Sequence, residues 1–246
     1  MQAPAPSINH RSVPQLGRFE EVTSHEVNAL LRAAPNKQCS ADFAPTWLVK
    51  QMGDGLAPVI TDMINKSFED GCFPSSQKEA IVRRRLKKSS LDPTDLTSFR
   101  PILNLSFISK LIERAATNRF TARASLFQLL PVHHSACRKF HSTETAILLD
   151  VLSFRFGVTD RAYEWFSSYL TGRTQVISTN TCTSQAVALT CGVRQGSVVG
   201  PHKFTAYTED MEERIESFNV KDHLYAEDIQ GLTHAYFANF NVANQI

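Results

Sequence analysis

Residues 99–117 read Phe-Arg-Pro-Ile-Leu-Asn-Leu-Ser-Phe-Ile-Ser-Lys-Leu-Ile-Glu-Arg-Ala-Ala-Thr. The second half of this stretch predicts an amphipathic helix over residues 106–127, because its apolar side chains recur at three- and four-residue steps. Its apolar face consists of Phe107, Ile108, Leu111, Ile112, Ala115 and Ala116. A helix with one apolar face must bury that face against other elements, so the flanking sequence decides the class of fold.

The sequence before this helix predicts a second amphipathic helix and a basic strand. Apolar residues at helical spacing span residues 47–68, and we expect Pro58 to split that helix because proline lacks a backbone donor. Residues 79–86 predict a short strand. Residues 89–100 predict a loop, since they contain a proline and several small polar side chains.

The sequence after residue 127 mixes helical and strand patterns. Helices are predicted at 141–154 and 160–170, paired strands at 174–177 and 186–191, and a strand–turn–strand unit at 223–232. This irregular order favours an α+β fold over a regular alternation of strands and helices.

Two carboxylates stand side by side at the predicted turn of the last unit, in the sequence Tyr225-Ala226-Glu227-Asp228. At a sharp bend two adjacent carboxylates can both reach a hard cation, because the bend breaks the alternation of side chains along a strand. A solvated acidic turn explains the same residues, and the pattern alone favours that interpretation.

Two further stretches suit contact with phosphates. Gly192, Gly196 and Gly200 lie close together before a predicted helix, where small residues permit close approach of a ligand to the backbone. A plain strand-to-helix turn capped by Ser197 explains them equally well. Clustered cations occur in residues 82–88 and can also bind phosphates. A solvated face or an import signal is the alternative.

Composition indicates an ordinary globular chain. The 246 residues are 42% hydrophobic and 20% charged, with a formal net charge of +2, which suits one domain or two small ones. No apolar run is long enough to cross a bilayer. We expect a flexible lead-in at residues 1–18 without the apolar core of a signal peptide, no membrane association, and a cytoplasmic or nuclear location.

In chain order, these stretches resemble the reverse transcriptase domain of non-LTR retrotransposons, the LINE type. The resemblance runs from about Phe19 to about Leu232 and rests on many motifs in the correct order. The motifs are Ala44 to Lys50, Phe73 to Lys78, Leu91 to Ile102, Leu105 to Arg114, Ser135 to Arg138, His141 to Ala146, Trp165 to Leu170, Arg173 to Gln175, Gly192 to Pro201, and Tyr225 to Asp228.

The resemblance implies an incomplete right-hand polymerase fold, with a fingers-like region at 19–141 and a partial palm at 142–246. It implies a family activity of RNA-templated DNA synthesis with Mg²⁺, and RNA or DNA as partners. Glu227 and Asp228 match the family's catalytic, metal-binding hairpin. The implied nucleic-acid-binding residues are Arg83, Arg85, Lys87, Lys88, Arg100, Arg138, Gln195 and Gly196.

Several departures from the family predict that polymerase activity is lost. The family's strand with its first catalytic Asp is expected to be missing, because residues 145–153 run almost directly into Arg155-Phe156-Gly157-Val158. Asp150 belongs by its spacing to the preceding helix and not to that strand. Glu227 replaces an Asp, and its extra methylene moves the carboxylate by roughly 1–1.5 Å where a site tolerates about 0.5 Å. We also expect no thumb, and an unpaired edge on the hairpin at 223–232.

Two alternatives to a remnant polymerase stay open at this stage. One is a non-catalytic module that keeps the basic fingers surface and binds RNA or DNA. The other is the product of a decayed element that has no function.

Overall fold

The computed structural model describes residues 12–37, 39–92, 94–129, 134–135, 145–179, 182–189, 197–199, 221–225 and 228–232. Helices and strands are both present, which confirms the α+β class at this coarse level. Within the described ranges, no helix has the length and apolar character needed to span a membrane.

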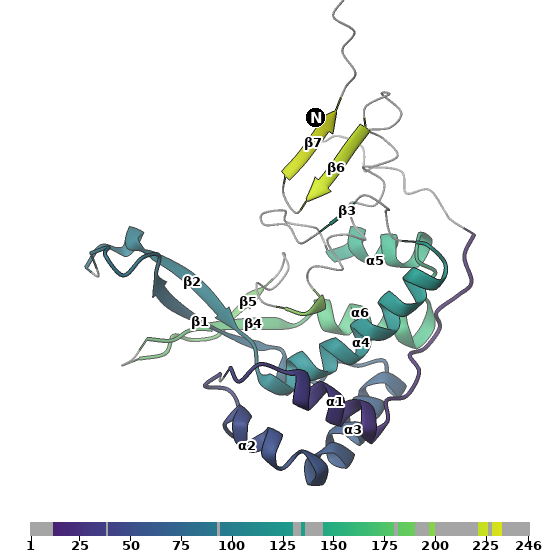
Figure 1. Ribbon diagram of the computed structural model, residues 1–246, viewed down its shortest axis with the longest axis horizontal. Coiled ribbons are helices and arrows are strands. Elements are labelled where there is room, and N and C mark those ends of the chain that lie inside the picture. Colours follow the sequence, from purple (N-terminus) through teal and green to yellow (C-terminus); the bar gives the residue numbers. More distant parts are fainter. Residues whose placement is uncertain are drawn as a thin grey trace, which may run out of the picture.

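The helices and strands alternate irregularly along the chain (Figure 1). The helices are α1 (Ser24–Ala33), α2 (Thr46–Gln51), α3 (Gly53–Glu69), α4 (Phe107–Leu126), α5 (Thr145–Phe154) and α6 (Asp160–Leu170). The strands are β1 (Glu79–Leu86), β2 (Phe99–Asn104), β3 (His134–Ser135), β4 (Arg173–Ile177), β5 (Val187–Leu189), β6 (Lys221–Tyr225) and β7 (Asp228–Leu232).

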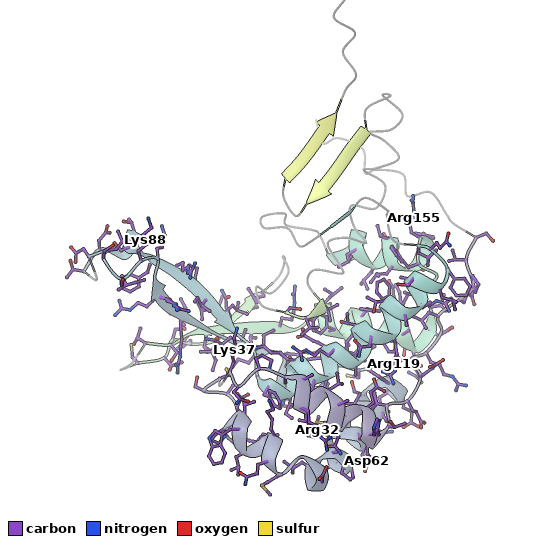
Figure 2. The ribbon with its side chains drawn as sticks, in the orientation of Figure 1. Arg32, Lys37, Asp62, Lys88, Arg119 and Arg155 are labelled. Carbon is purple, nitrogen blue, oxygen red and sulfur yellow. The ribbon has the colours of Figure 1, made fainter. Side chains whose placement is uncertain are left out.

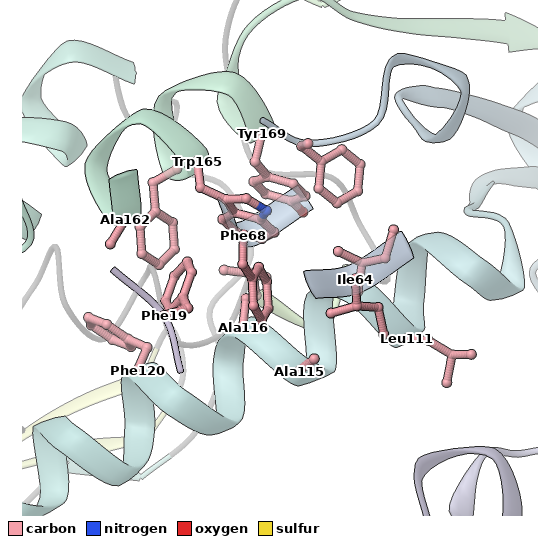
Figure 3. Close-up of a cluster of buried hydrophobic side chains, with 14 of the residues drawn as sticks. Phe19, Ile64, Phe68, Leu111, Ala115, Ala116, Phe120, Ala162, Trp165 and Tyr169 are labelled. Atoms are coloured by element: carbon pink, nitrogen blue, oxygen red, sulfur yellow. The ribbon is translucent and has the colours of Figure 1, made fainter. Parts of the chain in front are cut away.

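One hydrophobic core joins α1, α3, α4, α5 and α6, and an aromatic cluster lies at its centre (Figure 3). Trp165 is fully buried, and its ring stacks on Tyr169 with centroids 5.6 Å apart. Phe19 and Phe68 meet the Trp165 ring edge-on, at 5.5 and 5.9 Å. Edge-on and stacked pairs are the geometries that aromatic rings prefer, so this cluster fixes α6 against α3 and the N-terminal segment.

The long helix predicted over residues 47–68 divides at Met52, and the prediction that Pro58 divides it is wrong. Pro58 lies inside α3 and is exposed. Because proline has no backbone N–H, the carbonyl oxygen one turn earlier lacks its helical hydrogen bond and is free to bond to water. Gly53 begins α3 at a close approach to α1, where a Cβ would lie 3.2 Å from Asn28 Oδ1. The break at Met52 therefore lies next to a close contact between α1 and α3.

A four-stranded sheet has the order β2-β1-β4-β5, with β1 antiparallel to β2 and parallel to β4. Strand β1 and the β4–β5 pair confirm three predicted strands, with bounds that differ by one or two residues for the pair. Strand β2 was missed, because its Pro101 argues against a strand. Proline is tolerated there because β2 is the edge of the sheet.

Helix α5 passes almost directly into α6, and every residue from 145 to 179 is described. Only residues 155–159 separate the two helices, and Gly157 makes the turn with a φ of 66°. In this interval the only β pairing is an isolated bridge between Val158 and Leu16. Asp150 lies in α5, as its spacing predicted.

Strands β6 and β7 form an antiparallel hairpin, with Tyr225 paired to Asp228, as the sequence predicted. The expectation of an unpaired edge is wrong for part of β6, because β3 pairs with it in parallel. The pairing joins His134 to Leu224 and Ser135 to Tyr225. A short strand from elsewhere in the chain therefore occupies two positions along that edge.

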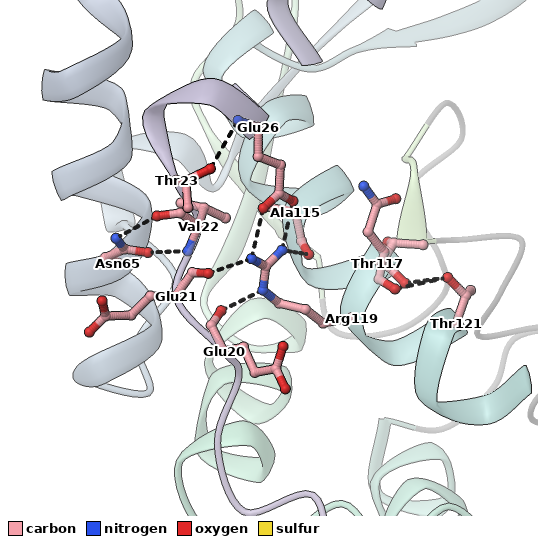
Figure 4. Close-up of polar contacts among 11 residues, drawn as sticks. Glu20, Glu21, Val22, Thr23, Glu26, Asn65, Ala115, Thr117, Arg119 and Thr121 are labelled. Atoms are coloured by element: carbon pink, nitrogen blue, oxygen red, sulfur yellow. Dashed lines mark hydrogen bonds and ion pairs between the residues drawn. The ribbon is translucent and has the colours of Figure 1, made fainter. Parts of the chain in front are cut away.

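Polar contacts fasten the segment before α1 to α3 and α4 (Figure 4). Asn65 exchanges two hydrogen bonds with the backbone of Val22, at 2.7 and 3.0 Å. Arg119 forms a bidentate pair with Glu26, at 2.9 and 3.0 Å, and also donates to the carbonyl oxygens of Glu20, Glu21 and Ala115. These contacts hold the N-terminal segment on the same core as the rest of the chain.

Candidate nucleic-acid interface

The β1–β2 hairpin projects from the helical body, and Lys88 lies at its far end (Figures 1 and 2). Pairing between β1 and β4 stops at Val82, whereas pairing between β1 and β2 continues to Leu86. Beyond Val82 the hairpin is therefore a two-stranded ribbon with solvent on both faces. Such a projecting hairpin can contact an extended polymer, such as a nucleic acid, at a distance from the helices.

The register of the hairpin brings three of the predicted binding residues to one face. Arg85 lies directly opposite Arg100, and Arg83 lies opposite Ile102. Side chains two residues apart share a face, as do residues directly opposite on paired strands. Arg83, Arg85 and Arg100 therefore extend outward from one side, all exposed.

The cations of this hairpin have no carboxylate partner within the described part of the chain. Residues 83–100 contain six Lys and Arg residues and only two Asp residues. The ion pairs of the described residues join other parts of the molecule, such as Arg119 with Glu26 and Arg161 with Glu164. The surface from Arg83 to Arg100 thus has an excess of positive charge that an added polyanion would neutralise.

The two carboxylates near the tip are committed to local turns. Asp92 accepts hydrogen bonds from the backbone and hydroxyl of Thr94, at 2.8 and 2.7 Å, and these bonds lower the pKa of Asp92. The hydroxyl and backbone of Thr97 likewise lower the pKa of Asp95, with a smaller contribution from the charge of Lys87. Both side chains therefore shape the loop at the tip.

The opposite face of the hairpin has an aromatic contact that the sequence analysis did not identify. The guanidinium of Arg84 lies 5.0 Å from the centroid of the Phe99 ring, a cation–π arrangement. Neither residue was a predicted binding residue. The alternation of side chains along a strand predicts that Arg84 lies on the face opposite to Arg83 and Arg85. Its contact with Phe99 could not be predicted, because that contact depends on the cross-strand register.

The other predicted site residues lie apart from this face or outside the described residues. Lys87 and Lys88 follow β1 and are exposed. Asp150 is exposed on α5. Asp228 begins β7, where the backbone alone is described. Four predicted residues fall outside the described residues: Arg138, Gln195, Gly196 and Glu227.

The described residues do not assemble the ligand set that a magnesium site requires. Mg²⁺ prefers several oxygen ligands in near-octahedral geometry. Among the described side chains, no three His, Cys, Asp or Glu residues lie close enough together to hold a metal ion.

Two curated relatives are similar to nearly the whole chain. Both are described as RNA-directed DNA polymerase from mobile element jockey, one from Drosophila funebris and one from Drosophila melanogaster. The first is 22% identical over 253 residues, covering 87% of this chain, and the second is 24% identical over 251 residues, covering 86%. The chain spans only 28% and 27% of their lengths. No family model matches it.

The motif order and this coverage define a homologue of the reverse transcriptase domains of mobile elements. Its relatives come from jockey, a non-LTR element of the LINE type, which confirms the resemblance found in the sequence. Over most of its own length the chain is therefore similar to the reverse transcriptase of a retrotransposon.

Proposed function

We propose that this chain is a non-catalytic nucleic-acid-binding module, in which the β1–β2 hairpin binds RNA or DNA and polymerase activity has been lost. The observation that carries the proposal is the exposed face formed by Arg83, Arg85 and Arg100. Arg85 and Arg100 are directly opposite each other, and like charges in that arrangement destabilise a hairpin. Phosphates binding between them would remove this repulsion and form charge-assisted hydrogen bonds.

The proposed loss of polymerase activity rests on the count of carboxylates. Glu227 and Asp228 supply at most two anions at the hairpin, and the resemblance implies a further carboxylate on a strand at a place in the chain where α5 runs almost directly into α6. Each 1.36 kcal/mol of lost transition-state stabilisation slows a reaction about tenfold, and metal ions supply several kcal/mol. A chain without the complete ligand set should therefore show no detectable synthesis.

A filter-binding titration with single-stranded RNA tests the binding proposal. Wild-type affinity should fall steeply as salt rises, by about 0.7 log units per log unit of salt for each phosphate neutralised. A triple variant in which Ser replaces Arg83, Arg85 and Arg100 should lose about two units of that slope. The control is Arg32→Ala, because Arg32 is equally exposed but lies on the helical body, 3.8 Å from Asp54 (Figure 2). A wild-type affinity that is flat across salt would contradict the proposal.

A further inference from the structure

The β1–β2 hairpin has a second face, which differs in chemistry from the arginine face formed by Arg83, Arg85 and Arg100. Arg84 lies on it directly opposite Pro101, and Leu86 lies directly opposite Phe99. We call these four residues the aromatic face. None of them is among the binding residues that the family resemblance implies. The aromatic face combines one cation with a ring and two aliphatic side chains, whereas the arginine face carries three cations.

The guanidinium of Arg84 is held in place by an aromatic ring. Its central carbon lies 5.0 Å from the centroid of the Phe99 ring, within the range of a cation–π contact. Within the described part of the chain, Arg84 forms no ion pair and its side chain makes no hydrogen bond. Arg84 is exposed, whereas Phe99 is half-buried. The ring therefore covers one side of the planar guanidinium, and the other side is open to solvent.

A planar cation with an open side is a surface on which a nucleobase can stack. The ring beneath Arg84 restricts the conformations of its side chain, so less conformational entropy is lost when a base binds. Bases inside a duplex have both sides covered by their neighbours, and only an unpaired base has a side available. The aromatic face thus fits single-stranded nucleic acid.

The outer edge of β1 gives a single strand access to both faces of the hairpin. Strand β4 pairs with β1 only as far as Val82. Among the residues that the structure describes, no strand pairs with this edge of β1 from Arg83 to Leu86. A flexible strand that crosses the edge there can place phosphates on the arginine face and a base against Arg84 on the aromatic face.

We propose that the aromatic face binds one unpaired base of a single-stranded nucleic acid, which stacks on the open side of the Arg84 guanidinium while phosphates bind to the arginine face. This inference rests on the proposed binding function and names its ligand as single-stranded. Arg84 contacts the base, and Phe99 is a positioning residue that fixes the guanidinium. Stacking uses the planar surface of the base and not the 2′-hydroxyl, so RNA and DNA bind alike at this position.

Two oligonucleotides that differ only in their bases isolate the stacking contact. One is a short single-stranded oligouridylate, and the other has the same sugar–phosphate backbone without bases. Wild-type affinity for the first should exceed that for the second by about fivefold or more, the lower end of what one stacked base contributes. The ratio of the two affinities is the readout, because a partly unfolded variant loses affinity for both oligonucleotides equally. The corresponding pair of DNA oligonucleotides should give the same ratio.

Substitutions on the aromatic face assign the ratio to that face. Arg84→Lys keeps the charge but lacks the planar guanidinium, so the ratio should fall toward one while the salt slope stays as in wild type. Phe99→Leu removes the ring beneath the cation and should lower the ratio, whereas Phe99→Tyr keeps a ring and should retain it. The control is Arg32→Lys on the helical body, which should leave the ratio unchanged.

The outcomes separate this inference from the proposed function. Failure of the wild type to bind either oligonucleotide would contradict nucleic-acid binding itself. Equal wild-type affinities for the two would overturn the stacking contact and leave phosphate binding by the arginine face standing. A ratio that Arg84→Lys leaves unchanged, that is the same in Phe99→Leu and Phe99→Tyr, or that is found with RNA alone would also overturn the stacking contact.

Discussion

Replacing Arg85 by Thr should stabilise the free protein and weaken its binding to RNA. Arg85 and Arg100 are paired directly across β1 and β2, with no carboxylate partner among the described residues. Like charges in that arrangement cost about 0.2–1 kcal/mol, and Thr favours a strand. A variant that is more stable but binds RNA less tightly is the result expected if the charge of Arg85 serves to bind a ligand.

The size of both effects follows from the structure. The hairpin presents five predicted binding cations that are described and exposed: Arg83, Arg85, Lys87, Lys88 and Arg100. At about 0.7 per phosphate, five contacts give a salt slope near −3.5, and Arg85→Thr should reduce it to about −2.8. Between 50 and 200 mM salt, affinity should then fall about 130-fold for wild type and about 50-fold for the variant. The melting temperature of the free variant should rise by about 1–4 °C.

Thermal unfolding and filter binding with a single-stranded oligonucleotide measure the two effects on the same preparations. The matched control is Arg84→Thr, which removes the same charge from the same strand but on the face away from Arg100. It should not stabilise the protein, because it relieves no direct repulsion and removes the contact with Phe99. The reasoning is refuted if Arg85→Thr lowers the melting temperature, leaves the salt slope unchanged, or behaves as Arg84→Thr does.

Three further predictions concern catalysis, stability and pH. Primer extension with Mg²⁺ or Mn²⁺ should show no synthesis, and Glu227→Asp should not restore it because the strand expected to be missing is the larger defect; template-dependent product would contradict this. Arg119→Met should lower the free energy of unfolding by about 2 kcal/mol in chemical denaturation, since it leaves several acceptors unpaired, whereas Arg32→Met should cost under about 1 kcal/mol; equal costs would argue against the N-terminal attachment. The lowered pKa values of Asp92 and Asp95 mean that their turns are stabilised above the ordinary Asp pKa and lose that support as the pH falls through the lowered values. The protection of tip-loop amides relative to their intrinsic exchange rates should therefore be constant at pH 5 to 8 and fall near pH 3, and a fall already at pH 6 would count against it.

The amino-acid sequence by itself determined the class of fold, the resemblance to a family and several elements. Helix α6 and strand β1 have the predicted bounds, and α4 differs by one residue at each end. Hydrophobic periodicity and capping residues are local properties, so a single window of sequence contains the information for them. The resemblance drawn from the order of the motifs agrees with the two relatives, which are 22% and 24% identical.

Only the tertiary structure decided which residues meet. Pro58 stays inside α3, and the helix breaks at Met52, six residues earlier than the sequence predicted and next to the close approach of α1 to Gly53. Strand β2 was hidden by a proline that an edge position tolerates. Arg85 faces Arg100 because of the cross-strand register. The buried Glu113 accepts a hydrogen bond from Ser197, 84 residues further along the chain. Such pairings join chain segments that are far apart in sequence. A local pattern of residues carries no information about which distant segment it will contact.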